Sequence, residues 1–163
     1  MKIELLSKNF TLSELCDSLT AAKYGINNEP CPLYESNLEE LAVRVLQPIR
    51  DMVGMPIQIS SGYRSAKLNK LVGGSSTSAH RYGYAADIVC SDMRLLQRKV
   101  LEWAKNNPFD QIIIEQPTNR VASWVHVGWK KGSDSSQRKQ ILVGVKVNGK
   151  WSYRPITKEY YWV

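Results

Sequence analysis

Two histidines and one aspartate are spaced as the ligands of a metal ion could be. His80 precedes Asp87 by seven residues with Gly83 between them, so a bend at this glycine can place the imidazole beside the carboxylate. His126 lies farther along, and the chain has only these two histidines. Two imidazoles and one carboxylate leave the fourth position of a tetrahedral zinc ion open for water, as in catalytic zinc sites. Such an ion lowers the pKa of that water and polarises a scissile carbonyl group.

Two predicted strands position these ligands. Residues 84–90 and 123–129 alternate between two faces, which puts Asp87 on a face of the first strand and His126 on the same face as Trp124 in the second. A carboxylate flanked by small and apolar residues needs a partner, and a cation is the usual one. The spacing alone leaves a second interpretation open, in which each histidine is a hydrogen-bonded core or surface residue.

Two N-terminal helices precede these strands. Thr11 and Glu14 form a capping box that starts the first helix, which is predicted to continue to Gly25. Apolar residues at helical spacing over 38–53 predict the second helix. Pro48 is expected to kink or divide it, because proline lacks the backbone N–H group that a helix interior uses.

Further strands and one longer helix complete the expected fold. Strands are predicted at 57–61 and 110–116, and the segment 141–156 is a hairpin candidate because an Asn-Gly pair suits its two-residue turn. Ser91 is expected to cap a helix over 93–107. Leading helices followed by hairpin-connected strands predict an α+β fold, with the N-terminal helices packed on a small, mainly antiparallel sheet.

The composition is that of one soluble globular domain. The chain has 163 residues, 43% apolar and 23% charged, and no apolar run approaches the roughly 20 residues of a membrane helix. The N-terminal residues lack the apolar stretch of a secretory signal, so we expect synthesis in the cytoplasm without a signal peptide. The three cysteines lack CxxC spacing, and we expect buried free thiols.

The net charge of +7 is unevenly distributed. Residues 57–163 contain 17 basic and 7 acidic side chains, net +10, whereas residues 1–56 contain 5 and 8, net −3. A basic half is attracted to a polyanion, which could be nucleic acid, anionic lipid or an anionic cell-wall polymer. The charge does not choose among these partners, although nothing in the sequence resembles a base-reading motif.

A set of motifs resembles a known family, the zinc D-Ala-D-Ala carboxypeptidase-like murein peptidases. That group also includes phage endolysins that cleave L-alanyl-D-glutamate bonds, and it shares its fold with the Hedgehog N-terminal domain. The resemblance covers about residues 9–129. Its motifs are Ser78-x-His80-x-x-Gly83-x-Ala85-x-Asp87, the preceding Ser61-Gly62-Tyr63-Arg64-Ser65 and Asn69, and the later Trp124-Val125-His126-Val127.

The resemblance implies roles for five side chains. His80, Asp87 and His126 match the zinc ligands, so we expect one Zn2+ ion with water in the fourth position. Arg64 matches an arginine that contacts a substrate carboxylate, which a guanidinium binds through two hydrogen bonds. A structural ion pair is the alternative for this arginine. Ser78 is expected to add a hydrogen bond near the metal or substrate, or else to cap its loop.

The general base is where the sequence departs from the family's pattern. Several relatives have a carboxylate three residues before the last histidine, but this chain has Ser123 there. Glu115 resembles the catalytic glutamate of the Hedgehog-like arrangement, so we predict that it is the general base. A solvated glutamate at a strand end is the alternative. Relatives often have histidine at the position of Trp124, which we expect to line the substrate groove.

The C-terminal residues lie outside the resemblance. They are rich in basic and aromatic side chains, which suit stacking on sugars or bases. We predict a zinc murein peptidase domain over 1–131 and, over 132–163, a basic, aromatic hairpin extension of the same domain. The extension either covers the sheet edge or forms a wall-binding surface.

The predicted function is hydrolysis of an amide bond in peptidoglycan stem peptides or cross-links, as by an endolysin or a carboxypeptidase. The bond is left open among D-Ala-D-Ala, L-alanyl-D-glutamate and a cross-link. The alternative is a catalytically weak or inactive zinc-containing cell-wall-binding module, because Ser123 replaces a carboxylate. We expect a monomer that acts at the bacterial cell wall. A bacteriophage origin is expected, and a bacterial source stays open as the alternative. Its expected partners are the peptidoglycan peptide and, as a further candidate, anionic wall polymers, with no membrane span and no specific nucleic acid.

Overall fold

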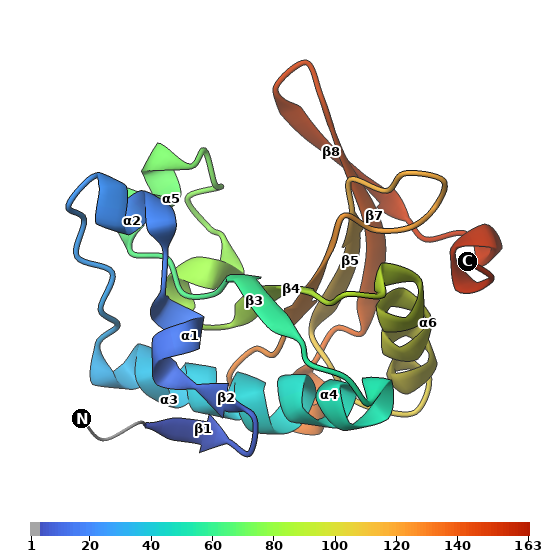
Figure 1. The fold of residues 1–163 in the computed structure, drawn as a ribbon, viewed down its shortest axis with the longest axis horizontal. Helices are drawn as coiled ribbons and strands as arrows, with labels where there is room; N and C mark the ends of the chain where they lie inside the picture. The colour runs from blue at the N-terminus through green and yellow to red at the C-terminus, as the bar shows by residue number, and fades with distance from the viewer. Residues whose placement is uncertain (1–3) are drawn as a thin grey trace.

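A six-stranded sheet lies at the centre of the computed structural model, which describes residues 4–163 (Figure 1). Residues 1–3, with which the predicted peptidase domain begins, lie outside the described residues. Neighbouring strands are antiparallel except β5 and β7, which are parallel, so the sheet is mainly antiparallel as predicted. In spatial order its strands are β3 (Gln58–Ser61), β4 (Ala85–Val89), β6 (Trp124–Gly128), β5 (Gln111–Glu115), β7 (Gln140–Val147) and β8 (Lys150–Pro155).

One face of this sheet packs against helices and forms the core. The alternate residues Ile88, Val125 and Ile112 are fully buried, together with Leu96 and Val100 of α6 (Met93–Ala104). Burying each of these side chains contributes about 1.5–3 kcal/mol relative to exposure. The residues between them in the strands point to the opposite face, which is open to a cleft.

The N-terminal segment contains two short helices where one was predicted. After the small hairpin of β1 (Leu5–Ser7) and β2 (Phe10–Thr11), the predicted capping box of Thr11 and Glu14 is present and starts α1 (Leu12–Cys16). A second helix, α2 (Leu19–Lys23), then begins because the Ser18 side chain accepts the Ala21 N–H. The prediction of one helix to Gly25 is therefore wrong.

The second predicted helix extends further towards the N-terminus than expected. It begins with α3 (Pro32–Leu41), passes through a π-helical segment (Ala42–Leu46) and continues as α4 (Gln47–Val53). In this wide turn the N–H of Gln47, the residue directly before Pro48, donates to the Ala42 carbonyl. The π-turn therefore accommodates a proline that would otherwise collide with the preceding turn.

Helix α6 is capped by Asp92, so the predicted Ser91 cap is wrong. The Asp92 carboxylate accepts the Leu95 N–H at 2.9 Å. Asp92 is the better acceptor, because a carboxylate can accept from the exposed N–H groups of the first turn and favours their partial positive charge. The helix ends at Ala104, before Pro108 as predicted.

The predicted C-terminal hairpin is present as β7 and β8, joined at Asn148 and Gly149. Both turn residues have positive φ, 51° and 77°, as a tight hairpin turn requires. The hairpin extends beyond the rest of the sheet (Figure 1). Four short helical segments complete the described fold. They are α5 (Ala66–Leu71) and the 3-10 segments Ala79–Tyr82, Asp134–Ser136 and Lys158–Tyr161, of which α5 and Ala79–Tyr82 precede β4.

The three cysteines are free within residues 4–163, as predicted. Cys31 is exposed, however, while Cys16 and Cys90 are only partly buried, so the expectation of buried thiols is wrong for Cys31. No helix within residues 4–163 is long and apolar enough to cross a membrane.

Candidate metal centre

The three predicted ligands come together because a loop and two strands meet. His80 lies in a 3-10 turn, η2 (Ala79–Tyr82), which ends at Gly83. Gly83 has a φ of 73°, and a Cβ there would lie 2.6 Å from the Tyr34 carbonyl oxygen, so glycine alone fits this bend. The chain then enters β4, where Asp87 is paired directly with His126 of β6. The predicted bend and the predicted strand faces are both confirmed.

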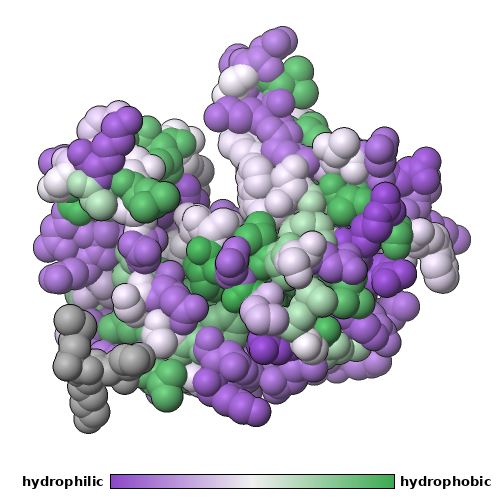
Figure 2. Space-filling model, in the orientation of Figure 1, coloured by the Kyte–Doolittle hydropathy of each residue, from purple (hydrophilic) through white to green (hydrophobic). Residues whose placement is uncertain are grey.

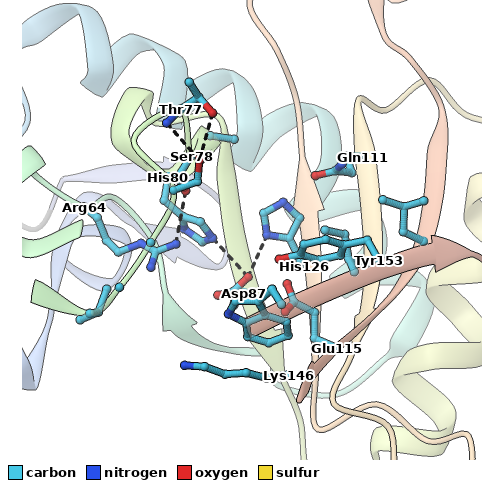
Figure 3. Close-up of a pocket in the computed structure, with 18 of the residues that line it drawn as sticks. Arg64, Thr77, Ser78, His80, Asp87, Gln111, Glu115, His126, Lys146 and Tyr153 are labelled. Carbon is cyan, nitrogen blue, oxygen red and sulfur yellow. Dashed lines mark hydrogen bonds and ion pairs between the residues drawn. The ribbon is translucent and has the colours of Figure 1, made fainter. Parts of the chain in front are cut away.

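The side chains converge on the Asp87 carboxylate (Figure 3). Asp87 Oδ1 lies 3.3 Å from His80 Nε2 and 3.0 Å from His126 Nδ1. One ligand atom from each residue can be chosen so that all three lie within 4.8 Å of one another. The group could therefore hold one metal ion.

The partner of the other His80 nitrogen fixes which atom faces Asp87. His80 Nδ1 lies 2.7 Å from the Gly62 carbonyl oxygen, which can only accept, so Nδ1 carries the hydrogen. The Nε2 lone pair then faces a carboxylate oxygen at 3.3 Å. Two acceptors at this distance need a cation between them. Such an outer hydrogen bond is also how proteins orient a metal-binding histidine.

The protonation states match those of zinc ligands. Burial lowers the pKa of His80, which favours the neutral imidazole. The pKa of Asp87, which faces both imidazoles, lies below its usual value, so its carboxylate is ionised at neutral pH. Neutral imidazole and ionised carboxylate are the forms that bind a metal. The donor set therefore fits zinc.

Glu115 lies in the same cleft as the ligand group. It is paired with Trp124 across β5 and β6, and its neighbour on the same face, Ile113, is paired with His126. Glu115 is only 7% exposed. Burial, and then the charge of Asp87, raise its pKa to about 7, against lowering by His126 and others. The cleft has a volume of about 830 Å³ and is lined by Glu115 and all three ligands.

Arg64 and Ser78 lie on the His80 side of the group, across from Glu115 (Figure 3). An Arg64 terminal nitrogen donates to Ser78 Oγ at 3.4 Å. Within residues 4–163 Arg64 has no carboxylate within 4.0 Å, so the structural ion pair weighed as its alternative is absent there. Ser78 occupies the N-cap position of η2, but its side chain makes no capping hydrogen bond. Both side chains line the cleft.

Ser123 and Trp124 have different surroundings. The Ser123 hydroxyl donates to the Gln116 carbonyl at 2.6 Å and so takes part in the turn between β5 and β6. Trp124 lines the cleft, where its ring meets that of Trp151 edge to face at 6.1 Å.

Sequence reasoning missed the cleft residues from the C-terminal hairpin. Lys146, Trp151 and Tyr153 line the same cleft as the ligand group. Figure 2 shows the molecule hollowed between this hairpin and the α2–α5 region. The alternation of residues along β7 and β8 could have identified one face, but not that this face borders the metal centre.

A mixed α/β fold that presents two imidazoles and a carboxylate beside a buried glutamate has the composition of a metallopeptidase centre. The comparisons with known proteins agree with that class. The model of the family described as peptidase M15 matches residues 8–128, about three quarters of the chain, and the chain belongs to this family.

A curated relative is the zinc D-Ala-D-Ala carboxypeptidase of Streptomyces albus G. It is 36% identical to this chain over 69 residues, which are 42% of this chain and 26% of the relative. The chain thus matches about a quarter of that protein's length. Together the family and the relative support a zinc peptidase, and the group of His80, Asp87 and His126 could hold one metal ion.

Proposed function

We propose that this protein hydrolyses an amide bond in peptidoglycan stem peptides or their cross-links. The observation on which the proposal rests is the convergence of His80, Asp87 and His126 on one point, in a cleft that also contains the buried Glu115. The zinc D-Ala-D-Ala carboxypeptidase among its relatives supports the substrate class.

The zinc ligands are proposed to be His80 Nε2, an Asp87 oxygen and His126 Nδ1. Zinc held there would polarise the scissile carbonyl and lower the pKa of a nearby water molecule. Glu115 is the proposed general base, which accepts a proton from the attacking water and delivers it to the leaving amine. Its burial suits this role, because a carboxyl group with a raised pKa can both accept and return a proton near neutral pH.

Arg64 is the proposed contact for a substrate carboxylate. Its guanidinium lines the cleft with no carboxylate partner within residues 4–163, and burial lowers its pKa although Asp87 and Glu115 partly compensate. An anionic ligand would restore the charge balance of this partly buried cation. Stem peptides carry carboxylates that can pair with it. Ser78 then orients Arg64, and Trp124 lines the groove.

The position of Glu115 bears on the alternative of an inactive wall-binding module. That alternative rested on the missing carboxylate at position 123. Because Glu115 is buried beside the ligand group, the cleft contains a base without it. We therefore favour an active hydrolase at the bacterial cell wall, with the Hedgehog-like fold and a phage endolysin role as parts of the same proposal.

Digestion of purified sacculi by the zinc-loaded protein tests this function. Mass spectrometry of the released muropeptides should show new amine and carboxyl ends at one type of amide bond, which also identifies that bond. The Asp87→Ala variant is the matched control and should release nothing. Unchanged sacculi with a zinc-loaded wild-type protein would contradict the proposal and favour the binding module.

A further inference from the structure

The C-terminal hairpin forms one wall of the metal cleft. β7 and β8 lie outside residues 8–128, which the family match covers. β7 nevertheless pairs in parallel with β5, the strand of Glu115, so the open face of the sheet continues without a break from the ligands to the hairpin. The residues of this face therefore border the bond to be cleaved.

The absence of a side chain at Gly144 determines the position of Tyr153. Gly144 is paired with Glu115 on one side and with Tyr153 on the other. A Cβ on Gly144 would lie only 2.8 Å from Tyr153 Cε1 and 3.1 Å from Cδ1. The Tyr153 ring therefore lies across Gly144, from β8 towards β5. It also stacks on Trp151, with an interplanar angle of 11° and a centroid distance of 5.9 Å.

This position brings the Tyr153 hydroxyl to the metal centre. Figure 3 shows Tyr153 and Glu115 together on the His126 side of Asp87, away from Arg64. Burial, then the charges of Glu115 and Asp87, raise the pKa of Tyr153 above its ordinary value. A tyrosine phenol, whose ordinary pKa is about 10, keeps its hydrogen at neutral pH and can donate it. No hydrogen bond within residues 4–163 occupies this hydroxyl, while Tyr160 uses its own to accept from Arg154.

We propose that Tyr153 is a catalytic residue whose hydroxyl donates a hydrogen bond to the oxygen of the scissile carbonyl. The inference rests on the proposed function of this cleft. As the water oxygen bonds to the carbonyl carbon, the π electrons move to the carbonyl oxygen, and the hydrogen bond stabilises that charge without transfer of the phenolic proton. When the amide C–N bond breaks, the amine leaves with the proton that Glu115 returns.

The Tyr153→Phe variant is the first test, because it keeps the ring and its stacking on Trp151. We expect its kcat on a purified muropeptide to fall roughly 100-fold, while KM and zinc content stay close to wild type. Tyr161→Phe is the matched control, since Tyr161 lies in the 3-10 segment that contacts α6 and does not line the cleft, so both constants should stay unchanged. A fall in kcat of less than about fivefold, or a rise in KM alone, would overturn the inference.

Binding of a phosphinate analogue of the cleaved bond gives a second readout that does not depend on turnover. Its tetrahedral oxygens occupy the positions of the reacting oxygens, so Tyr153→Phe should weaken the affinity measured by calorimetry about tenfold or more. Affinity for the hydrolysis products should change less than about twofold. Equal affinity of both proteins for the phosphinate would contradict the inference.

Gly144→Ala tests the geometry, because the added methyl group must displace the Tyr153 ring. We expect a kcat loss similar to that of Tyr153→Phe, and little further loss when the two substitutions are combined. Additive losses would mean that the two residues act independently and would overturn the inference. If the zinc-loaded wild type cleaves no muropeptide, the proposed function fails and this inference with it; activity with an unaffected Tyr153→Phe refutes this inference alone.

Discussion

The two sides of the metal centre are held in different ways. On the His80 side, hydrogen bonds to backbone groups hold the residues in place. The Gly62 carbonyl accepts from the His80 ring, and the Arg64 N–H donates to the His80 carbonyl at 3.0 Å. On the His126 side the residues lie on adjacent strands, with Glu115 paired to Trp124 and Ile113 to His126. The first side thus holds Arg64, the proposed contact for substrate, and the second holds Glu115, the proposed general base, on a rigid sheet.

Helix α1 helps to hold the His80 side of the centre. Its last buried residue, Leu15, accepts the Tyr63 N–H at 2.6 Å, which fixes the segment that includes Gly62 and Arg64. The short capped helix at the N-terminus therefore positions the acceptor for His80 from a distant part of the sequence. Substitutions on the two sides should consequently affect different kinetic constants.

The largest effect is expected where the two sides share Asp87. Asp87→Ala removes the carboxylate that both histidines face, so we expect loss of zinc and a fall in hydrolysis to background. Metal analysis after gel filtration and a muropeptide digest check this. Asp134→Ala, at an exposed turn, is the control and should keep both zinc and activity. Full activity in a metal-free Asp87→Ala protein would break the account of the centre as a whole.

The acid limb of the pH profile tests the His126 side. The general base must be deprotonated, so kcat/KM should fall about tenfold per pH unit below the pKa of Glu115. Burial raises that pKa from 4.5 to about 7 in the metal-free protein, and the positive charge of zinc lowers it. We expect the zinc-loaded enzyme to inflect between these values. The same inflection in Glu115→Gln would assign the titration to another group.

Arg64→Lys tests the His80 side. Lysine keeps the charge but cannot form the paired hydrogen bonds of a guanidinium with a carboxylate, so we expect KM to rise roughly 10- to 30-fold. Because Arg64 is proposed to bind rather than to react, kcat should change little. Steady-state kinetics on one muropeptide separate the constants. A large fall in kcat with unchanged KM would reverse the roles given to the two sides.

The smallest effect is expected for the ion pair of Asp110 and Arg138, which lie just before β5 and β7 respectively. Asp110 is buried and accepts from Arg138 at 2.8 and 3.0 Å. Burial alone would raise the pKa of Asp110, but these hydrogen bonds lower it, so the stabilisation is present at neutral pH and is lost as pH falls through the lowered pKa.

Asp110→Asn should therefore lower the free energy of unfolding at pH 7 by about 1–2 kcal/mol, a modest value because Arg138 is half exposed. Urea denaturation at pH 7 and pH 3 measures it, and the difference from wild type should shrink at pH 3. Asp134→Asn, at an exposed site, is the control. An equal or larger difference at pH 3 would contradict the assignment.

The sequence predicted most of the sheet because its strands have one apolar face, which gives a clear alternation. It did not predict the break between α1 and α2, since Ser18 has the same polar character inside a helix as at a cap. The parallel pairing of β5 with β7 was also missed, because the polar segment 130–139 contains no signal of which strand the chain joins next. Local periodicity therefore predicts individual strands better than it predicts which strands pair with each other.

The candidate site shows the same limit. A glycine bend predicted that His80 lies beside Asp87, and the two-residue period predicted the strand faces of Asp87 and His126. The resemblance implied that His126 joins them, and the structure brings the three together. The proximity of Tyr153 could not be predicted, because it depends on a missing side chain at Gly144 on a neighbouring strand. Pairing register, which no local pattern reveals, determines that contact.

The Glu115→Gln variant tests the central claim most directly, because it separates metal binding from hydrolysis. Zinc content and the rate of muropeptide cleavage should be measured on the same preparation beside wild type. We predict one zinc per chain in both proteins and a rate at least about 100-fold lower in the variant. A zinc-loaded Glu115→Gln protein that cleaves at the wild-type rate would contradict the assignment of Glu115 as the general base of this cleft.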